Sequence, residues 1–124
     1  MPNILVVDDE PVSLMLLDAI LRRSKYEVMT ALSAQEARSL LETEPIDLII
    51  LDLLMPDVDG LTFLQQLREN EKYQHLPIIV FTAVSQNRVR QEAFQKGATT
   101  FLTKPISSRE LTRIVNTHLQ IPAA

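Results

Sequence analysis

The chain contains no cysteine and no tryptophan, only two glycines, and 5% aromatic residues. Without cysteine, neither a disulfide framework nor a thiolate metal site is possible, and the composition fits a reducing cytosol. Acidic residues such as Asp18 and Asp52 interrupt the apolar runs well short of the ~20 residues that a membrane-spanning helix requires. The first residues lack the basic region and the cleavage site of a secretory signal. We therefore expect a soluble, cytoplasmic protein with no membrane partner.

The charge balance is mildly acidic, with 16 acidic against 12 basic side chains and a formal net charge of -4. Such a balance argues against strong binding to a phosphate backbone, so direct contact with nucleic acid is not expected. The length of 124 residues with 46% apolar composition suits a single domain over residues 1–124.

Short apolar runs rich in β-branched residues alternate with segments of helical periodicity. Two of the helix starts are marked by serine followed three residues later by glutamate, at Ser33 and Ser107, and Gly97 is well placed to end the fourth helix. The nearly uninterrupted runs are typical of parallel strands that are buried on both faces. The predicted strands are residues 4–7, 27–30, 48–51, 78–81 and 99–102.

Five βα units with right-handed crossovers predict an α/β fold, a parallel doubly wound sheet of five strands with five helices. The strand order cannot be read directly from one sequence. Of the two common doubly wound orders, the five-stranded flavodoxin-like order 2-1-3-4-5 fits the count. This order places a crevice at the carboxyl ends of the first and third strands, where chemistry is expected.

Polar residues follow the predicted strands at their carboxyl ends: Asp8 and Asp9 after the first, Asp52 after the third, Thr82 after the fourth and Lys104 after the fifth. In a parallel sheet these positions converge on one edge. Carboxylates brought together repel by about 1 kcal/mol per close pair even in water. Mg²⁺ is the natural compensating cation, because it prefers oxygen ligands and needs only one or two carboxylates.

Asp52 is best interpreted as a nucleophile at this edge. A carboxylate can attack phosphorus and form an aspartyl phosphate when a metal ion and a lysine neutralise the developing charge. The ammonium of Lys104 suits a phosphoryl oxygen, and Thr82 offers a hydroxyl donor.

Several short motifs occur in order on fitting elements: VDDE at 7–10, LDLLMP at 51–56, DG at 59–60, TA at 82–83, GA at 97–98 and FLTKP at 101–105. Together they resemble the receiver domain of bacterial response regulators, and the resemblance covers essentially the whole chain. It implies that Asp52 is the phosphoacceptor. It also implies that Asp9, Asp52 and the backbone carbonyl of Leu54 bind Mg²⁺, with Asp8 acting largely through water.

The resemblance further implies a switch. Thr82 and Lys104 would hold phosphoryl oxygens, and Thr82 would move toward the phosphoryl group while Phe101 turns from outward to inward. This movement would alter the face built by the fourth helix, the fifth strand and the fifth helix. In the family the peptide bond that corresponds to Lys104–Pro105 is usually cis, an isomer that the sequence permits.

The implied function is a signalling switch whose only catalysis is on itself, rather than an enzyme. The phosphoryl group would come from a histidine kinase or a histidine phosphotransfer protein, and the signal would pass to a downstream protein target. Phosphorylation could also drive formation of a homodimer. The chain is either a stand-alone regulator or the receiver piece of a larger regulator or hybrid kinase.

Three alternatives remain. A Mg²⁺-dependent small-molecule phosphatase of the haloacid dehalogenase type requires a second carboxylate two residues after the nucleophile, where this chain has Leu54. A phosphorylation-independent interaction module would not use Asp52. A flavin carrier of the same fold is disfavoured by the scarcity of aromatic residues and glycine.

Two finer hypotheses concern apolar residues. Leu54 and Val84 either flank the path of an attacking water and slow the loss of phosphate, or simply pack the loops. The first helix carries two apolar stripes, of which the second either docks a histidine-containing partner helix or belongs to a broad core face. The first stripe is Val12, Met15, Leu16, Ala19 and Ile20, and the second is Leu14, Leu17 and Leu21.

Overall fold

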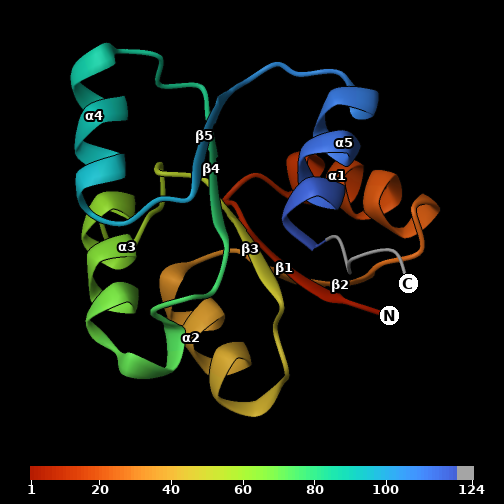
Figure 1. Cartoon of the computed structure of the whole chain (residues 1–124), viewed down its shortest axis with the longest axis horizontal. Coiled ribbons are helices and arrows are strands. Elements are labelled where there is room, and N and C mark those ends of the chain that lie inside the picture. Colours follow the sequence, from red (N-terminus) through yellow and green to blue (C-terminus); the bar gives the residue numbers. More distant parts are fainter. Residues whose placement is uncertain (120–124) are drawn as a thin grey trace.

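Five parallel strands form one sheet in the order β2-β1-β3-β4-β5, which confirms the predicted fold class and strand order. The structure is a computed structural model in which residues 1–119 are described. Figure 1 shows the sheet nearly edge-on between two layers of helices. The strands are β1 (Asn3–Val7), β2 (Glu27–Ala31), β3 (Leu48–Leu51), β4 (Ile78–Thr82) and β5 (Thr100–Thr103).

The helices cover both faces of the sheet (Figure 1). One face packs on α1 (Pro11–Arg23) and α5 (Ser108–Leu119). The other packs on α2 (Ala34–Thr43), α3 (Gly60–Glu69) and α4 (Asn87–Gln95). A short 3₁₀ helix, η1 (Glu71–Tyr73), follows α3 and was not predicted.

Alternate residues of each central strand face opposite layers of helices. In β1, Leu5 and Val7 face the α2–α3–α4 side, whereas Ile4 and Val6 face the α1–α5 side. Every residue of β3 and β4 is buried. The nearly continuous hydrophobic runs of the sequence therefore have the cause proposed for them, burial on both faces.

The predicted strand boundaries agree closely with the observed ones, and 48–51 is identical to β3. The fifth strand begins one residue later than predicted. Thr99 pairs with Ile78 partly through its side chain, whose hydroxyl accepts a hydrogen bond from the backbone N–H of Ile78 at 3.0 Å.

The predicted helix ends are confirmed by their local hydrogen bonds. The hydroxyl of Ser33 accepts from the N–H of Glu36, and that of Ser107 accepts from the N–H of Glu110, both at 3.1 Å. Gly97 follows α4 with φ of 112°, a backbone conformation that favours glycine.

The docking hypothesis for the second stripe of α1 is wrong. Leu14, Leu17 and Leu21 are buried in the core, whereas Val12, Met15 and Leu16 are 76%, 71% and 61% exposed. Both stripes are apolar at helical spacing, so the periodicity alone does not say which one faces the sheet. The leucine stripe packs against the sheet, which leaves the first turns of α1 with an exposed apolar surface.

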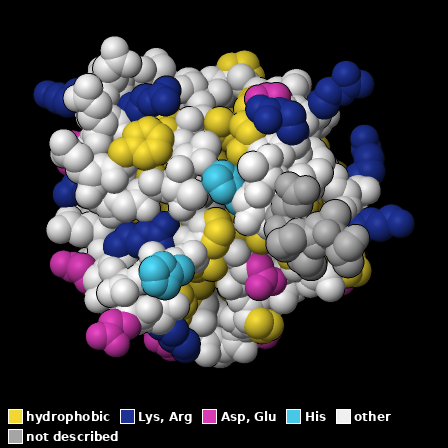
Figure 2. Space-filling model, in the orientation of Figure 1, with side chains coloured by type: hydrophobic (Ala, Val, Ile, Leu, Met, Phe, Trp, Pro, Cys, Tyr) yellow, Lys and Arg dark blue, Asp and Glu magenta, His cyan; other side chains and the backbone are white. Residues whose placement is uncertain are grey.

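Within residues 1–119, no helix combines the length and the hydrophobicity needed to cross a membrane. On the face shown in Figure 2, hydrophobic side chains form separate small patches among polar atoms.

Candidate functional site

Four strand ends meet at one edge of the sheet and carry the predicted polar residues. Asp8 follows β1, Asp52 follows β3, Thr82 ends β4 and Lys104 follows β5. Asp8, Asp52 and Thr82 are 1%, 3% and 0% exposed, and they are the buried polar residues among residues 1–119. Burying two carboxylates is costly unless they are paired, so this edge requires a specific arrangement of charges.

Lys104 bridges the two buried carboxylates. Its Nζ donates to Asp8 Oδ2 at 2.7 Å and to Asp52 Oδ2 at 3.0 Å, and it lies 3.3 Å from Ser13 Oγ on α1. The peptide bond between Lys104 and Pro105 is cis. The lysine therefore joins the ends of β1 and β3 through a single cation.

The charge of Lys104 is well supported by its surroundings. Burial of the ammonium would lower the pKa of Lys104, but the hydrogen bonds to Asp8 and Asp52 outweigh this effect and raise the pKa above its usual value. The ammonium also lies 5.5 Å from the centre of the Phe81 ring, within range of a cation–π interaction. The lysine thus remains protonated at neutral pH.

Each buried carboxylate uses its second oxygen to accept a backbone hydrogen bond. Asp8 Oδ1 accepts from the N–H of Glu10 at 3.0 Å, and Asp52 Oδ1 accepts from the N–H of Leu54 at 3.1 Å. The hydroxyl of Thr82 accepts from the N–H of Val84 at 3.4 Å. These bonds hold both carboxylates in defined orientations at the edge of the sheet.

The donor set fits a hard divalent cation. Carboxylate oxygens of Asp8, Asp9 and Glu10 lie within 4.8 Å of one another. Two buried carboxylates share the single ammonium of Lys104, so the site keeps an excess of negative charge. Oxygen ligands and negative charge are what Mg²⁺ requires.

The predicted metal ligands are arranged in two groups. Asp8 and Asp9 cluster with Glu10, which was not predicted, while Asp52 is connected to Asp8 through Lys104. Glu10 completes the VDDE motif, so its position next to Asp8 and Asp9 in the sequence could have indicated that it belongs to the acidic cluster. Ser13 was also missed, and only the fold brings it to Lys104.

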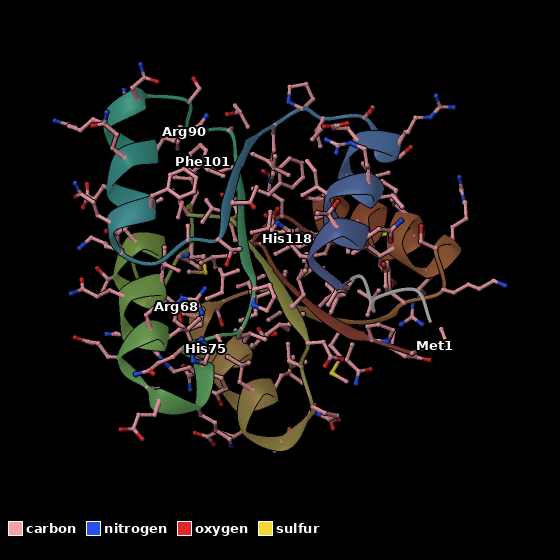
Figure 3. The ribbon with its side chains drawn as sticks, viewed as in Figure 1. Met1, Arg68, His75, Arg90, Phe101 and His118 are labelled. Carbon is pink, nitrogen blue, oxygen red and sulfur yellow. The ribbon has the colours of Figure 1, made fainter. Side chains whose placement is uncertain are left out.

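Phe101 is 6% exposed and packs in the core cluster that contains Ala93 of α4. Figure 3 shows its ring pointing from β5 toward α4. Phe101 is thus inward in this structure.

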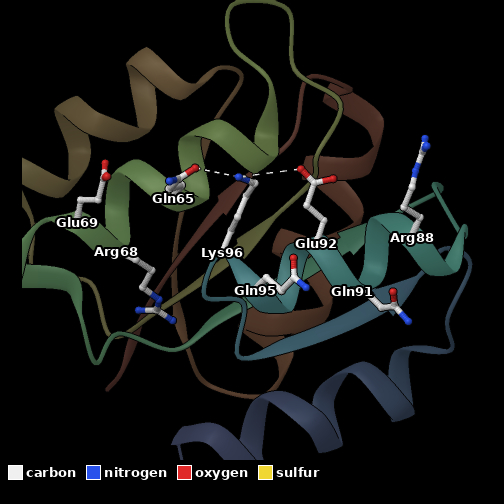
Figure 4. A pocket seen from close by; sticks show the side chains of 8 residues that line it. All are labelled: Gln65, Arg68, Glu69, Arg88, Gln91, Glu92, Gln95 and Lys96. Atoms are coloured by element: carbon white, nitrogen blue, oxygen red, sulfur yellow. Dashed lines mark hydrogen bonds and ion pairs between the residues drawn. The ribbon is translucent and has the colours of Figure 1, made fainter.

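A polar cleft of about 700 Å³ lies between α3 and α4, away from the strand ends. In Figure 4, Lys96 at the end of α4 reaches across the cleft to Gln65 of α3 at 2.9 Å. It also pairs with Glu92 of α4 at 4.0 Å. None of the predicted site residues lines this cleft. The predicted carboxylates, lysine and hydroxyl lie at the strand ends instead.

Comparison with known proteins identifies the family. A family model described as "Response regulator receiver domain" matches residues 4–116, so the chain belongs to the response-regulator receiver family. It is 36% identical over 111 residues to the DNA-binding dual master transcriptional regulator RpaA of Synechocystis, a match covering 90% of this chain and 46% of that protein. The chain spans less than half the length of the first curated relatives that it matches.

Solved structures agree with this assignment. The chemotaxis protein CheY4 of Vibrio cholerae is 30% identical with a TM-score of 0.89, and the match covers 94% of this chain and 98% of that one. The receiver domain of sensor histidine kinase PA1611 from Pseudomonas aeruginosa is 30% identical with a TM-score of 0.87, covering 97% and 98% of the two chains. The latter structure has a magnesium ion coordinated in its active-site cleft.

Proposed function

We propose that this receiver domain is a Mg²⁺-dependent switch that accepts a phosphoryl group on Asp52. The observation that carries the proposal is the buried bridge from Asp8 through Lys104 to Asp52, at the edge where the strand ends converge. An Asp52 oxygen attacks the phosphorus of a phosphohistidine. The new P–O bond forms as the P–N bond breaks, and the imidazole leaves with the bonding electrons and takes a proton from water.

The side chains around Asp52 supply the positive charge and hydrogen bonds for this transfer. Lys104 donates to one phosphoryl oxygen and the hydroxyl of Thr82 to another. When bound, Mg²⁺ neutralises charge on the phosphoryl oxygens.

The residues proposed to hold Mg²⁺ are Asp9, Asp52 and the backbone carbonyl of Leu54, with Asp8 acting largely through water. The oxygen cluster around Asp8 and the magnesium ion in the PA1611 receiver support this assignment.

The proposed switch links Thr82 to the face formed by α4, β5 and α5. Because Phe101 is already inward, phosphorylation is proposed to stabilise this arrangement by drawing Thr82 toward the phosphoryl group. The α4–β5–α5 face then contacts a downstream protein target or a second copy of the chain. Catalysis is restricted to the domain's own phosphorylation and dephosphorylation.

The proposed phosphodonor is a histidine kinase or a histidine phosphotransfer protein in the cytoplasm. The exposed apolar residues Val12, Met15 and Leu16 lie on the first turns of α1, directly after the acidic cluster. This surface is suited to packing against a partner helix that presents its histidine to Asp52.

Intact-mass measurement with acetyl phosphate tests the proposed function. The wild type is expected to gain one acid-stable, hydroxylamine-labile phosphoryl group in Mg²⁺ and none in EDTA, and Asp52→Ala is expected to gain none. No gain by the wild type with any small phosphodonor or metal condition would favour a phosphorylation-independent interaction module.

A further inference from the structure

Asp57 caps a helix that is distant from it in sequence. It lies in the loop between β3 and α3, and its Oδ1 and Oδ2 accept from the backbone N–H groups of Ala34 at 3.2 Å and Gln35 at 3.0 Å. The third N–H group of α2, that of Glu36, is capped by Ser33. Asp57 therefore binds the two N–H groups that the local cap leaves free.

The chemistry of this contact is favourable. A carboxylate at a helix N-terminus is stabilised by the partial positive charge of the helix end. Slight burial would raise the pKa of Asp57, but the hydrogen bonds from Gln35 and Ala34 outweigh it and lower the pKa. Asp57 is thus ionised, with both oxygens engaged, across the pH range in which phosphoryl transfer would operate.

The loop that contains Asp57 also contains the Leu54 carbonyl, and both of its ends are fixed. The N–H of Leu54 is bonded to Asp52, and the N–H of Gly60 donates to the carbonyl of Leu53 at 3.1 Å. A Cβ on Gly60 would lie 2.4 Å from the Cα of Leu53, so this close approach requires glycine. Between these ends, Asp57 supplies the polar contacts that join the loop to α2.

We propose that Asp57 is a positioning residue for the metal site. By binding the N-terminus of α2, it fixes the loop between β3 and α3 so that the Leu54 carbonyl and Asp52 can bind the same Mg²⁺. The inference rests on the proposed function, because it assumes the Mg²⁺ ligands named there. It adds a physical connection between α2 and the site. Since such coupling is reciprocal, Mg²⁺ binding strengthens the hold of the loop on α2.

Ser33 provides a matched control. Ser33→Ala removes a cap from the same turn of α2 but leaves the loop attached through Asp57. Asp57→Ala removes two hydrogen bonds from the same turn and also detaches the loop. A role limited to helix stability would leave the Mg²⁺ affinity of both variants close to that of the wild type.

The test is calorimetric titration of the full chain with Mg²⁺. Asp57→Ala is expected to weaken Mg²⁺ affinity about three- to tenfold. This is less than the effect of removing a group that is hydrogen-bonded directly to a metal ligand. Ser33→Ala is expected to change the affinity by less than about twofold. If Asp57→Ala does not fold, Asp57→Asn replaces it in the test. Because this variant keeps one acceptor oxygen, its Mg²⁺ affinity is expected to fall by less than the about three- to tenfold given for Asp57→Ala. Equal effects of Asp57→Ala and Ser33→Ala, or an unchanged affinity in Asp57→Ala, would overturn the inference.

Amide hydrogen exchange supplies a readout that does not depend on activity. Mg²⁺ is expected to slow exchange at the N–H groups of Ala34 and Gln35 in the wild type but not in Asp57→Ala. Slowing that is equal in both proteins would contradict the proposed coupling. If the wild type binds no Mg²⁺, the proposed metal site fails together with this inference, whereas normal binding by both proteins refutes this inference alone.

Discussion

Replacing Lys104 by methionine tests the charge arrangement at the strand ends. The substitution removes the ammonium between Asp8 and Asp52, which are 1% and 3% exposed, and keeps a long apolar side chain. Removing one partner of a buried ion pair costs about 3–5 kcal/mol. The Lys104 side chain keeps 18% exposure, so water partly compensates, and we expect a loss of about 2–3 kcal/mol at neutral pH without metal.

Urea unfolding followed by circular dichroism measures this loss. In Mg²⁺ the loss is expected to shrink, because a bound divalent cation compensates the same two carboxylates and stabilises the folded state. In EDTA, Asp52→Asn is expected to leave the free energy of unfolding unchanged or to raise it, because it leaves Lys104 paired one-to-one with Asp8. A loss below about 1 kcal/mol for Lys104→Met, or an equal loss for Asp52→Asn, would refute the reasoning.

The pH dependence of this loss has a defined sign. Because folding raises the pKa of Lys104, its contribution is fully present below the ordinary lysine pKa of about 10.4 and is lost as the pH rises through the folded value. The difference in stability between the wild type and Lys104→Met is therefore expected to narrow as the solution becomes strongly alkaline.

Three further predictions concern other loops of the chain. Gly97→Ala is expected to lower the free energy of unfolding by about 1–2 kcal/mol or more, because φ is 112° and the new Cβ would lie 2.4 Å from Cγ of Arg68. An unchanged melting temperature would contradict this prediction. Replacing Leu54 and Val84 together by polar residues is expected to speed loss of the aspartyl phosphate, followed by intact mass, because it opens a path for water; an unchanged rate would mean that both residues only pack the loops. The stability lost in Asp57→Asn is expected to be present above about pH 4 and to vanish as the pH falls through the lowered pKa of Asp57; a difference that persists in acid would contradict a role for its charge.

The strands were predictable because burial on both faces leaves a direct trace in the sequence. The run from 48 to 51 is wholly apolar and is followed by Asp52, so both its type and its end could be read. The convergence of Asp8, Asp52 and Lys104 followed from the parallel order alone. The direct contacts of Lys104 with both carboxylates depend on side-chain positions that the sequence does not determine.

The features that were missed depend on tertiary contacts. On α1, two apolar stripes have the same period, and the packing of the helix on the sheet decides which is buried. Asp57 looks like a turn residue in the sequence, and its contacts with α2 are 22 and 23 positions away along the chain. Arg68 similarly binds the backbone carbonyls of Tyr73, Leu76 and Gly97, which no local pattern indicates.

The central claim is that Asp52 forms the aspartyl phosphate. The most direct test is to phosphorylate the wild type with acetyl phosphate and Mg²⁺, reduce it with borohydride, and map the product by peptide mass spectrometry. Borohydride converts an aspartyl phosphate to homoserine, so the account predicts homoserine at position 52 and at no other aspartate. Homoserine at another position, or none in a protein that binds Mg²⁺ normally, would contradict it.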